Sequence, residues 1–157
     1  MKDGERAVLK VSAVTYGYFK NDEYKVIASN IPIAKAITPC KGDLLFSRAN
    51  TRELVGATAI VDRDYSNLLL PDKIWKLEVN DKVHPVFFKA YLSSDYIRKL
   101  LSAEASGTSG SMFNISMQKL RQIPVFVPAM EQQLLFVSFM EQLDKSKFTI
   151  QHLLHNI

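Results

Sequence analysis

The chain is poor in the features that mark secreted and membrane proteins. Cys40 is the single cysteine among 157 residues, which excludes an internal disulfide and fits a reducing compartment. No apolar run reaches the length of about 18 residues that a membrane-spanning helix needs. The first ten residues, MKDGERAVLK, lack the apolar core of a secretory signal. We therefore expect a cytoplasmic protein with no membrane partner.

Motifs of catalysis and cofactor binding are also lacking. There is no GxxxxGKS/T phosphate loop, no GxGxxG fingerprint and no motif for binding S-adenosylmethionine or methylating adenine. His152 and His155 lie three residues apart, but without a third ligand a solvated helix face explains them better than a metal site. Asp72 and Glu78 resemble part of a metal-dependent nuclease motif, yet Asn80 stands where that motif needs lysine. We expect a chain that is not an enzyme and that binds no metal or cofactor.

What is present is the composition of an ordinary globular domain with a slight excess of positive charge. Hydrophobic residues make up 47% and charged residues 23%. This length suffices for one domain with a buried core. The net charge of +4 permits binding to nucleic acid without requiring it.

The pattern of apolar residues predicts an α+β fold, with a compact mixed sheet, helices and a long C-terminal helix of coiled-coil type. Helical spacing over 85–105 predicts two helices that break near Ser93 and Ser94. Ser116 is placed to cap a short helix over 117–122, and Pro128 suits the entry to the long helix. Because strands and helices do not alternate regularly, a doubly wound sheet is disfavoured. Strands are predicted over 8–14, 24–28, 43–47, 55–61, 74–79 and 123–127.

The C-terminal helix carries an apolar seam at alternating steps of four and three, which only Lys147 breaks. Such a seam either packs on its own domain or pairs with another helix. We expect its first part to pack on the domain and its distal part to pair, giving an antiparallel two-fold homodimer. The expected division is a recognition domain over 1–128 and a spacer or dimerisation helix over 129–157. The seam residues are Phe136, Met140, Leu143, Ile150 and Leu154.

One polar loop, RANTRE at 48–53, has the chemistry of base recognition. Arginine can bind guanine with two hydrogen bonds and asparagine can bind adenine in the same way. Arg48, Asn50, Thr51 and Arg52 are therefore candidates for DNA contact. The competing interpretation is a solvated turn in which Asn50 and Thr51 satisfy the local backbone.

Further candidates lie in four other segments, of which one is the loop of Tyr18 and Lys20 after the first predicted strand. The run SGTSGS at 106–111 is either a plain linker or a loop that orders on phosphate or on a base edge. The basic residues around the short helix either contact phosphate or face solvent. Trp75, two residues after the candidate Lys73, is more simply explained as a core residue. These candidates are Thr108, Ser109, Ser111, Lys119, Arg121, Lys73, Tyr18 and Lys20.

Two stretches together resemble the target-recognition domains of specificity subunits from type I restriction–modification enzymes. One is KGDLLFSRANTRELVGATAIV at 41–61. The other combines Ile115 and Ser116, Leu120, the IPV at 123–125 and Pro128 ahead of the glutamate and glutamine at 131–132. The loop at 106–111 and the helical stretch at 86–101 fall in the matching order. The resemblance covers the chain from about residue 8 to residue 154.

The resemblance implies a subunit without a catalytic centre. In that family two recognition domains each bind half of a split DNA target, and two long helices separate them as an antiparallel pair. Methyltransferase subunits bind those helices, and a restriction subunit joins the assembly. This sequence matches one recognition domain and one helix, with seven residues ahead of the first predicted strand. We therefore expect a half-subunit, a truncated gene product or a fragment. The alternative function is a helix-pairing domain without DNA specificity.

Overall fold

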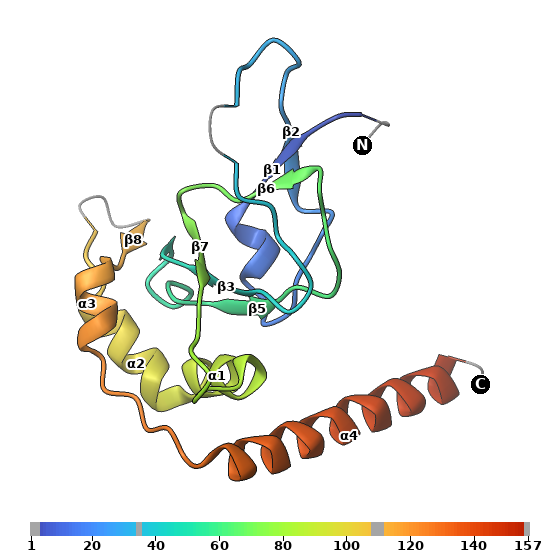
Figure 1. The fold of residues 1–157 in the computed structure, drawn as a ribbon, viewed down its shortest axis with the longest axis vertical. Coiled ribbons are helices and arrows are strands. Elements are labelled where there is room, and N and C mark those ends of the chain that lie inside the picture. Colours follow the sequence, from blue (N-terminus) through green and yellow to red (C-terminus); the bar gives the residue numbers. More distant parts are fainter. Residues whose placement is uncertain (1–3, 34–35, 108–111, 156–157) are drawn as a thin grey trace.

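The computed structural model describes residues 4–33, 36–107 and 112–155, and for 147–155 it describes the backbone alone. Three small sheets and flanking helices form the body, and a long helix follows it (Figure 1). The α+β class and the long C-terminal helix are thus confirmed. None of the helices in the described part of the chain is both long and apolar enough to span a membrane.

The central sheet has the order β5-β3-β7, and all its pairs are antiparallel. Its middle strand, β3 (Leu44–Ser47), is buried along its whole length between β5 (Thr58–Ile60) and β7 (Ile74–Leu77). A second sheet has the order β2-β1-β6, formed by β1 (Ala7–Leu9), β2 (Tyr24–Val26) and β6 (Leu68–Leu69). A third pairs β4 (Ala49–Asn50) with β8 (Phe113–Asn114).

Strand β3 divides the core because successive side chains of a strand point to opposite faces. Leu45 joins the cluster formed with the β2-β1-β6 sheet. Leu44 and Phe46 join the other cluster, against α1 (Pro85–Leu92) and α2 (Asp95–Glu104). The central sheet therefore lies between a small sheet and a helical layer, and the loops at its edge are built on a rigid base.

Two predicted strands are wrong in part or in whole. β1 ends at Leu9, and Val11–Val14 form a 3-10 helix in which Ala13 and Val14 are both fully buried. Two successive residues in a strand could not bury themselves on one face, so packing favours the helical turn. Residues 123–127 form no strand, since they pair with no strand in the described part of the chain and Pro124 lacks an N–H.

The predicted helices are confirmed. The break falls at Ser93 and Ser94 as expected, although the Ser94 hydroxyl donates to Tyr91 O and makes no cap bond. Ser116 caps α3 (Met117–Gln122) by accepting a hydrogen bond from Lys119 N at 3.2 Å. Helix α4 (Met130–His155) begins two residues after Pro128.

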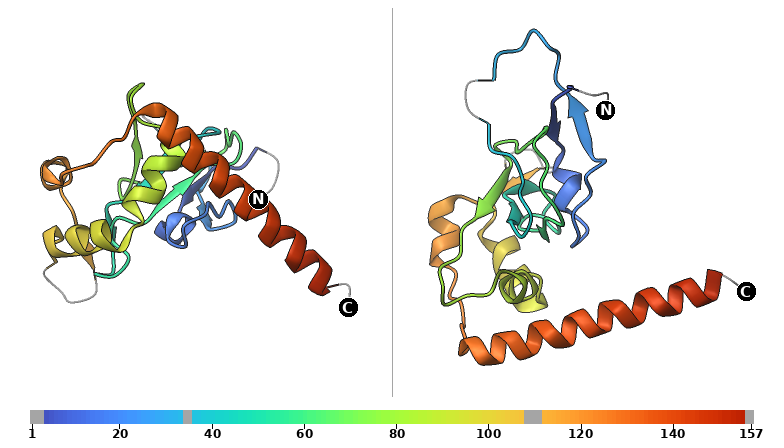
Figure 2. Two further views of the ribbon diagram at one scale, coloured as in Figure 1. Left: turned by 90° about the horizontal axis from the view of Figure 1, so that it is seen from below. Right: turned by 45° about the vertical axis from the view of Figure 1, so that its right-hand side comes forward.

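Over the part of helix α4 whose side chains are described, contact with the body is concentrated near its start. Gln133 is fully buried and Val137 nearly so, while Phe136 packs edge-on against Phe87 of α1 at 5.8 Å between ring centres. Residues 141–146 are all exposed. Figure 1 and the right-hand view of Figure 2 show the helix running past α1 and projecting beyond the body.

Candidate nucleic-acid interface

A closed loop at the end of β3 carries the main candidate residues. Ser47 N donates to Ala57 O at 2.8 Å and Gly56 N donates to Ser47 O at 2.7 Å, which joins the two ends of the loop. Val55 anchors it with a fully buried side chain. Inside the loop, the N–H groups of Leu54 and Val55 both donate to Thr51 O, at 3.1 and 2.8 Å. The residues from Thr51 to Val55, called the 51–55 loop below, therefore have a defined conformation.

Gly56 closes this loop in a conformation that only glycine adopts readily. Its φ is +81°, and a Cβ atom built there would lie 2.7 Å from Leu101 Cδ1. Helix α2 is the element that approaches the backbone closely at this glycine.

Arg48 precedes the loop and is held by its own chain. Its Nε donates to Asp72 O at 2.8 Å, its Nη2 lies 3.2 Å from Asp72 Oδ2, and its guanidinium lies 5.6 Å from the centre of the Trp75 ring. Trp75 in turn stacks on Phe46 and is half-buried, in line with the core interpretation. Arg48 therefore packs over the edge of the central sheet.

Asn50 also makes contacts within the chain. Its Nδ2 donates to Thr15 Oγ1 at 3.2 Å and to Ser47 Oγ at 3.4 Å, and its Oδ1 accepts from Thr51 N at 2.9 Å. The last bond is the local satisfaction that the competing interpretation expected. Asn50 thus links the 51–55 loop to the segment that follows the 3-10 helix at Val11–Val14.

Thr51 and Arg52 are exposed at the tip. Hydrogen bonds from the backbone N–H of Glu53 and then from the Thr51 side chain lower the pKa of the Glu53 carboxyl. The Arg52 guanidinium lies 4.2 Å from the centre of the Phe113 ring, and its Nη1 lies 3.5 Å from Ser102 O. Among the first four candidates, these two side chains are the best placed to meet a ligand from solvent.

Basic residues gather at the C-terminal end of α2, where the helix dipole favours positive charge. Besides Arg52, Lys119 reaches this end, with Nζ 2.7 Å from Glu104 O and 3.5 Å from Glu104 Oε2. Arg121 is exposed on the last turn of α3. The structure therefore brings Arg52 and Lys119 to one helix end.

The β4–β8 pair places other candidates beside the loop. Ser106 and Asn114 exchange backbone hydrogen bonds of 2.9 and 2.8 Å next to β4, so both ends of the 106–114 segment lie there. Lys73 Nζ contacts Met112 Sδ at 3.5 Å, and Arg48 N donates to Lys73 O. The remaining three candidates of this segment, Thr108, Ser109 and Ser111, lie outside the described residues.

Tyr18 and Lys20 belong to the segment that Asn50 contacts through Thr15. Lys20 Nζ lies 4.2 Å from the centre of the Tyr16 ring and 5.5 Å from that of Tyr18, and both rings are more than half exposed. A cation over an exposed aromatic pair is a polar-aromatic surface suited to a charged partner. These residues therefore extend the candidate interface beyond the 51–55 loop.

Sequence reasoning missed Arg98, which the structure places under this loop. Arg98 is half-buried on α2, its Nη1 donates to Val55 O at 2.7 Å and its Nη2 donates to Glu53 O. Burial lowers the pKa of its guanidinium. No sequence signal pointed to Arg98, although the helical spacing around it placed it on α2.

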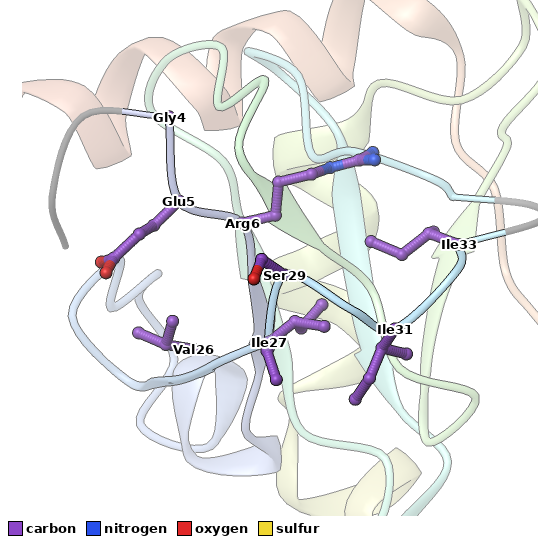
Figure 3. A pocket seen from close by; sticks show the side chains of 9 residues that line it. Gly4, Glu5, Arg6, Val26, Ile27, Ser29, Ile31 and Ile33 are labelled. Atoms are coloured by element: carbon purple, nitrogen blue, oxygen red, sulfur yellow. The ribbon is translucent and has the colours of Figure 1, made fainter.

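The pocket shown in Figure 3 lies elsewhere, at the start of the chain. Glu5 and Arg6 line it together with Ile27, Ile31 and Ile33. Its described lining holds no cysteine, histidine or cluster of carboxylates that would suggest a reaction. Within the described ranges, no group of three or more histidine, cysteine or acidic residues is arranged to hold a metal.

Comparison with known proteins agrees with these features. Residues 4–156 match the family model described as type I restriction modification DNA specificity domain. The chain belongs to this family. The family resemblance inferred from the sequence is confirmed, and a specificity domain agrees with the expectation of a recognition module rather than an enzyme.

Two relatives from Escherichia coli are similar over most of the chain. The specificity subunit of the type I restriction enzyme EcoEI is 28% identical over 88% of this chain and 23% of its own length. That of EcoKI, from strain K12, is 26% identical over 95% of this chain and 32% of its own length. The chain thus spans about a quarter to a third of these relatives.

The predicted helix seam is split by the structure. Phe136 and Met140 are half-buried, whereas Leu143 is 38% exposed. The side chains of Ile150 and Leu154 lie outside the described residues. Sequence analysis missed Leu135 and Phe139, which are 68% and 58% exposed on the adjacent face. The pairing role of the seam stays a prediction.

Proposed function

We propose that this chain recognises one half of a split DNA target for a type I restriction–modification system and docks methyltransferase subunits, which a restriction subunit joins. In this proposal residues 1–128 are the recognition unit and residues 129–157 the spacer helix. The assembly works in the cytoplasm, where its DNA is. The family of DNA specificity domains supports the recognition role, and the relatives are subunits of restriction enzymes.

The observation that carries the proposal is the construction of the 51–55 loop. Thr51 and Arg52 project from a loop whose backbone is closed by hydrogen bonds and whose Val55 is buried in the core. Side chains on such a rigid loop can contact base edges with little loss of conformational entropy on binding. A good bidentate contact gives about 1–3 kcal/mol of discrimination against the wrong base pair.

The test replaces Thr51 and Arg52 together by alanine in the chain assembled with its methyltransferase subunits. We expect the preference for the target duplex to fall while the melting temperature is unchanged, because both side chains are exposed. Lys25→Ala on exposed β2 is a control that removes one positive charge away from the loop. A preference that survives the double substitution would show that another segment carries the specificity.

The salt dependence of binding gives a second measure. Each lysine or arginine that contacts a phosphate contributes a slope of about −0.9 in log affinity against log salt concentration. Lys73, Lys119 and Arg121 are the proposed phosphate contacts. Replacing one of them should reduce the slope by about 0.9, whereas Lys25→Ala should leave it unaltered.

A second candidate function is helix-mediated association without DNA specificity, which the exposed residues Leu135 and Phe139 favour. Apolar side chains of this size on the outside of a helix suit a partner helix. We propose that the partner helix belongs to a second copy of this chain, in an antiparallel two-fold dimer that rebuilds the two-domain subunit. Duplex binding at low salt separates the two functions, since only the first predicts it.

Sedimentation tests the dimer. We expect the wild-type chain to dimerise and the Leu135→Glu, Phe139→Glu variant to be monomeric, with Leu54→Glu as an exposed apolar control away from α4. A wild-type chain that stays monomeric at high micromolar concentration contradicts the dimer.

A further inference from the structure

Arg98 holds the backbone of the 51–55 loop from below. Its two terminal nitrogens donate to two carbonyl groups of that segment, Val55 O at 2.7 Å and Glu53 O. The planar guanidinium presents its donors in a fixed fork, so two bonds to one loop fix position and orientation together. Arg98 therefore connects the conformation of this loop to helix α2.

The surroundings of Arg98 support a clamp rather than a surface charge. Among the described residues no ion pair involves Arg98, and its guanidinium donates to two backbone carbonyls. A positive charge that is half-buried without a carboxylate is retained at a cost in desolvation, which these charge-assisted bonds offset. The lowered pKa of its guanidinium reflects that burial.

The contact is tight because glycine allows α2 to approach. A Cβ atom at Gly56 would lie 3.1 Å from Arg98 Nη1 as well as 2.7 Å from Leu101 Cδ1. Helix α2 is itself fixed in the core by Ile97 and Leu101, which are both fully buried. The loop is thus held at one end by Val55 and Gly56 and in its middle by the bond to Glu53 O.

We propose that Arg98 is a positioning residue for DNA recognition, which sets the conformation in which Thr51 and Arg52 meet the duplex without touching the duplex itself. This inference rests on the proposed function. The Arg98 guanidinium donates to backbone carbonyls of the loop. The side chains of Thr51 and Arg52 are exposed and can contact DNA. Truncating Arg98 should therefore affect sequence preference more than general affinity.

The test compares Arg98→Met with Lys99→Met in the chain assembled with its methyltransferase subunits. Methionine keeps the apolar length of arginine and removes its donors, and Lys99 is an exposed neighbour that controls for the loss of one positive charge. The probes are a duplex pool with a randomised central window and amide hydrogen exchange of the free chain. Arg98→Lys, which keeps the charge and one flexible donor group, should restore part of the preference.

We expect Arg98→Met to lower the preference for the selected duplex over the pool by about 5- to 150-fold, the range of one bidentate base contact. Exchange of the Leu54 and Val55 amides, which donate to Thr51 O, should accelerate by about tenfold as the loop loosens. The salt slope should stay unchanged, and Lys99→Met should alter neither the preference nor the exchange.

Three results would overturn the inference. A salt slope reduced by about 0.9 in Arg98→Met would mean that Arg98 contacts phosphate directly. If Arg98→Met loses the same affinity for every sequence and the amides of Leu54 and Val55 exchange at the wild-type rate, Arg98 does not position the loop for sequence recognition. A wild-type assembly that shows no preference in the pool refutes the proposed function and the positioning role with it, and this result is visible before any variant is made.

Discussion

Gln133 is the residue on which the attachment of α4 most depends. It is fully buried, and every polar atom of its side chain has a partner. Oε1 accepts from His84 N at 2.8 Å, and Nε2 donates to Lys82 O and to Pro128 O, both at 2.8 Å. One side chain therefore joins the start of α4 to the segment before α1 and to the turn that leads into the helix.

Gln133→Met removes all three bonds while keeping the length of the side chain, so the cavity contribution is small. Leaving a buried donor or acceptor without a partner costs about 1–3 kcal/mol. Since the segments at 82–84 and 128 are only partly buried and water can reach some of these groups, we take the lower end for each. The expected loss of unfolding free energy is then about 3 kcal/mol. For a chain of this size that corresponds to a fall in melting temperature of about 6–12 °C.

The assay is thermal and urea unfolding of the wild type, Gln133→Met and Gln132→Met. Gln132 is the exposed neighbour on the same turn, and its variant should stay within about 0.5 kcal/mol of the wild type. The urea midpoint of Gln133→Met should fall without a change in slope, because the body still unfolds as one unit. If Gln133→Met melts within about 1 °C of the wild type, the three bonds do not hold α4 to the body and the reasoning fails.

Two further predictions concern the body. Gly42→Ala and Gly56→Ala both place alanine at positive φ, but the new Cβ meets Leu101 at Gly56 and no atom within 4 Å at Gly42. In urea melts, Gly56→Ala should therefore lower the unfolding free energy by about 1–3 kcal/mol more than Gly42→Ala. Equal losses would show that α2 yields to the new methyl group. Hydrogen bonds from Ser12 and then Lys10 lower the pKa of Glu23, so its contribution to stability is present above the ordinary pKa of 4.5 and lost as the pH falls through the lowered value. Glu23→Gln should therefore lose less stability than the wild type between neutral and acid pH, and parallel stability profiles would contradict this.

Local patterns predicted the elements whose reasons are local. The break between α1 and α2 at Ser93 and Ser94 followed from residue types, as did the cap at Ser116. The buried strand β3 followed from its apolar run. In each case the propensity of the segment and its place in the fold favour the same conformation.

Contacts between distant segments decided the rest. Residues 123–127 are as apolar as a strand, but they pair with none of the strands that the structure describes, and Phe126 stays 71% exposed. Asn50 has the chemistry of base recognition, yet its amide bonds Thr15, which is 35 residues away along the chain. The role of Arg98 under the 51–55 loop likewise depends on a contact over 43 residues, which no local spacing could indicate.

Helix α4 shows how one element can be fixed and still available to a partner. The body contacts the face of α4 that includes Gln133, Phe136 and Val137, so the first part of the predicted seam packs on its own domain. Leu135, Phe139 and Leu143 follow one another at steps of four on the adjacent face, where they remain exposed. A partner helix on that face would lie beside the body without displacing it. Docking therefore need not compete with the Gln133 hydrogen bonds, and the spacing between body and partner is set by a helix that is already anchored.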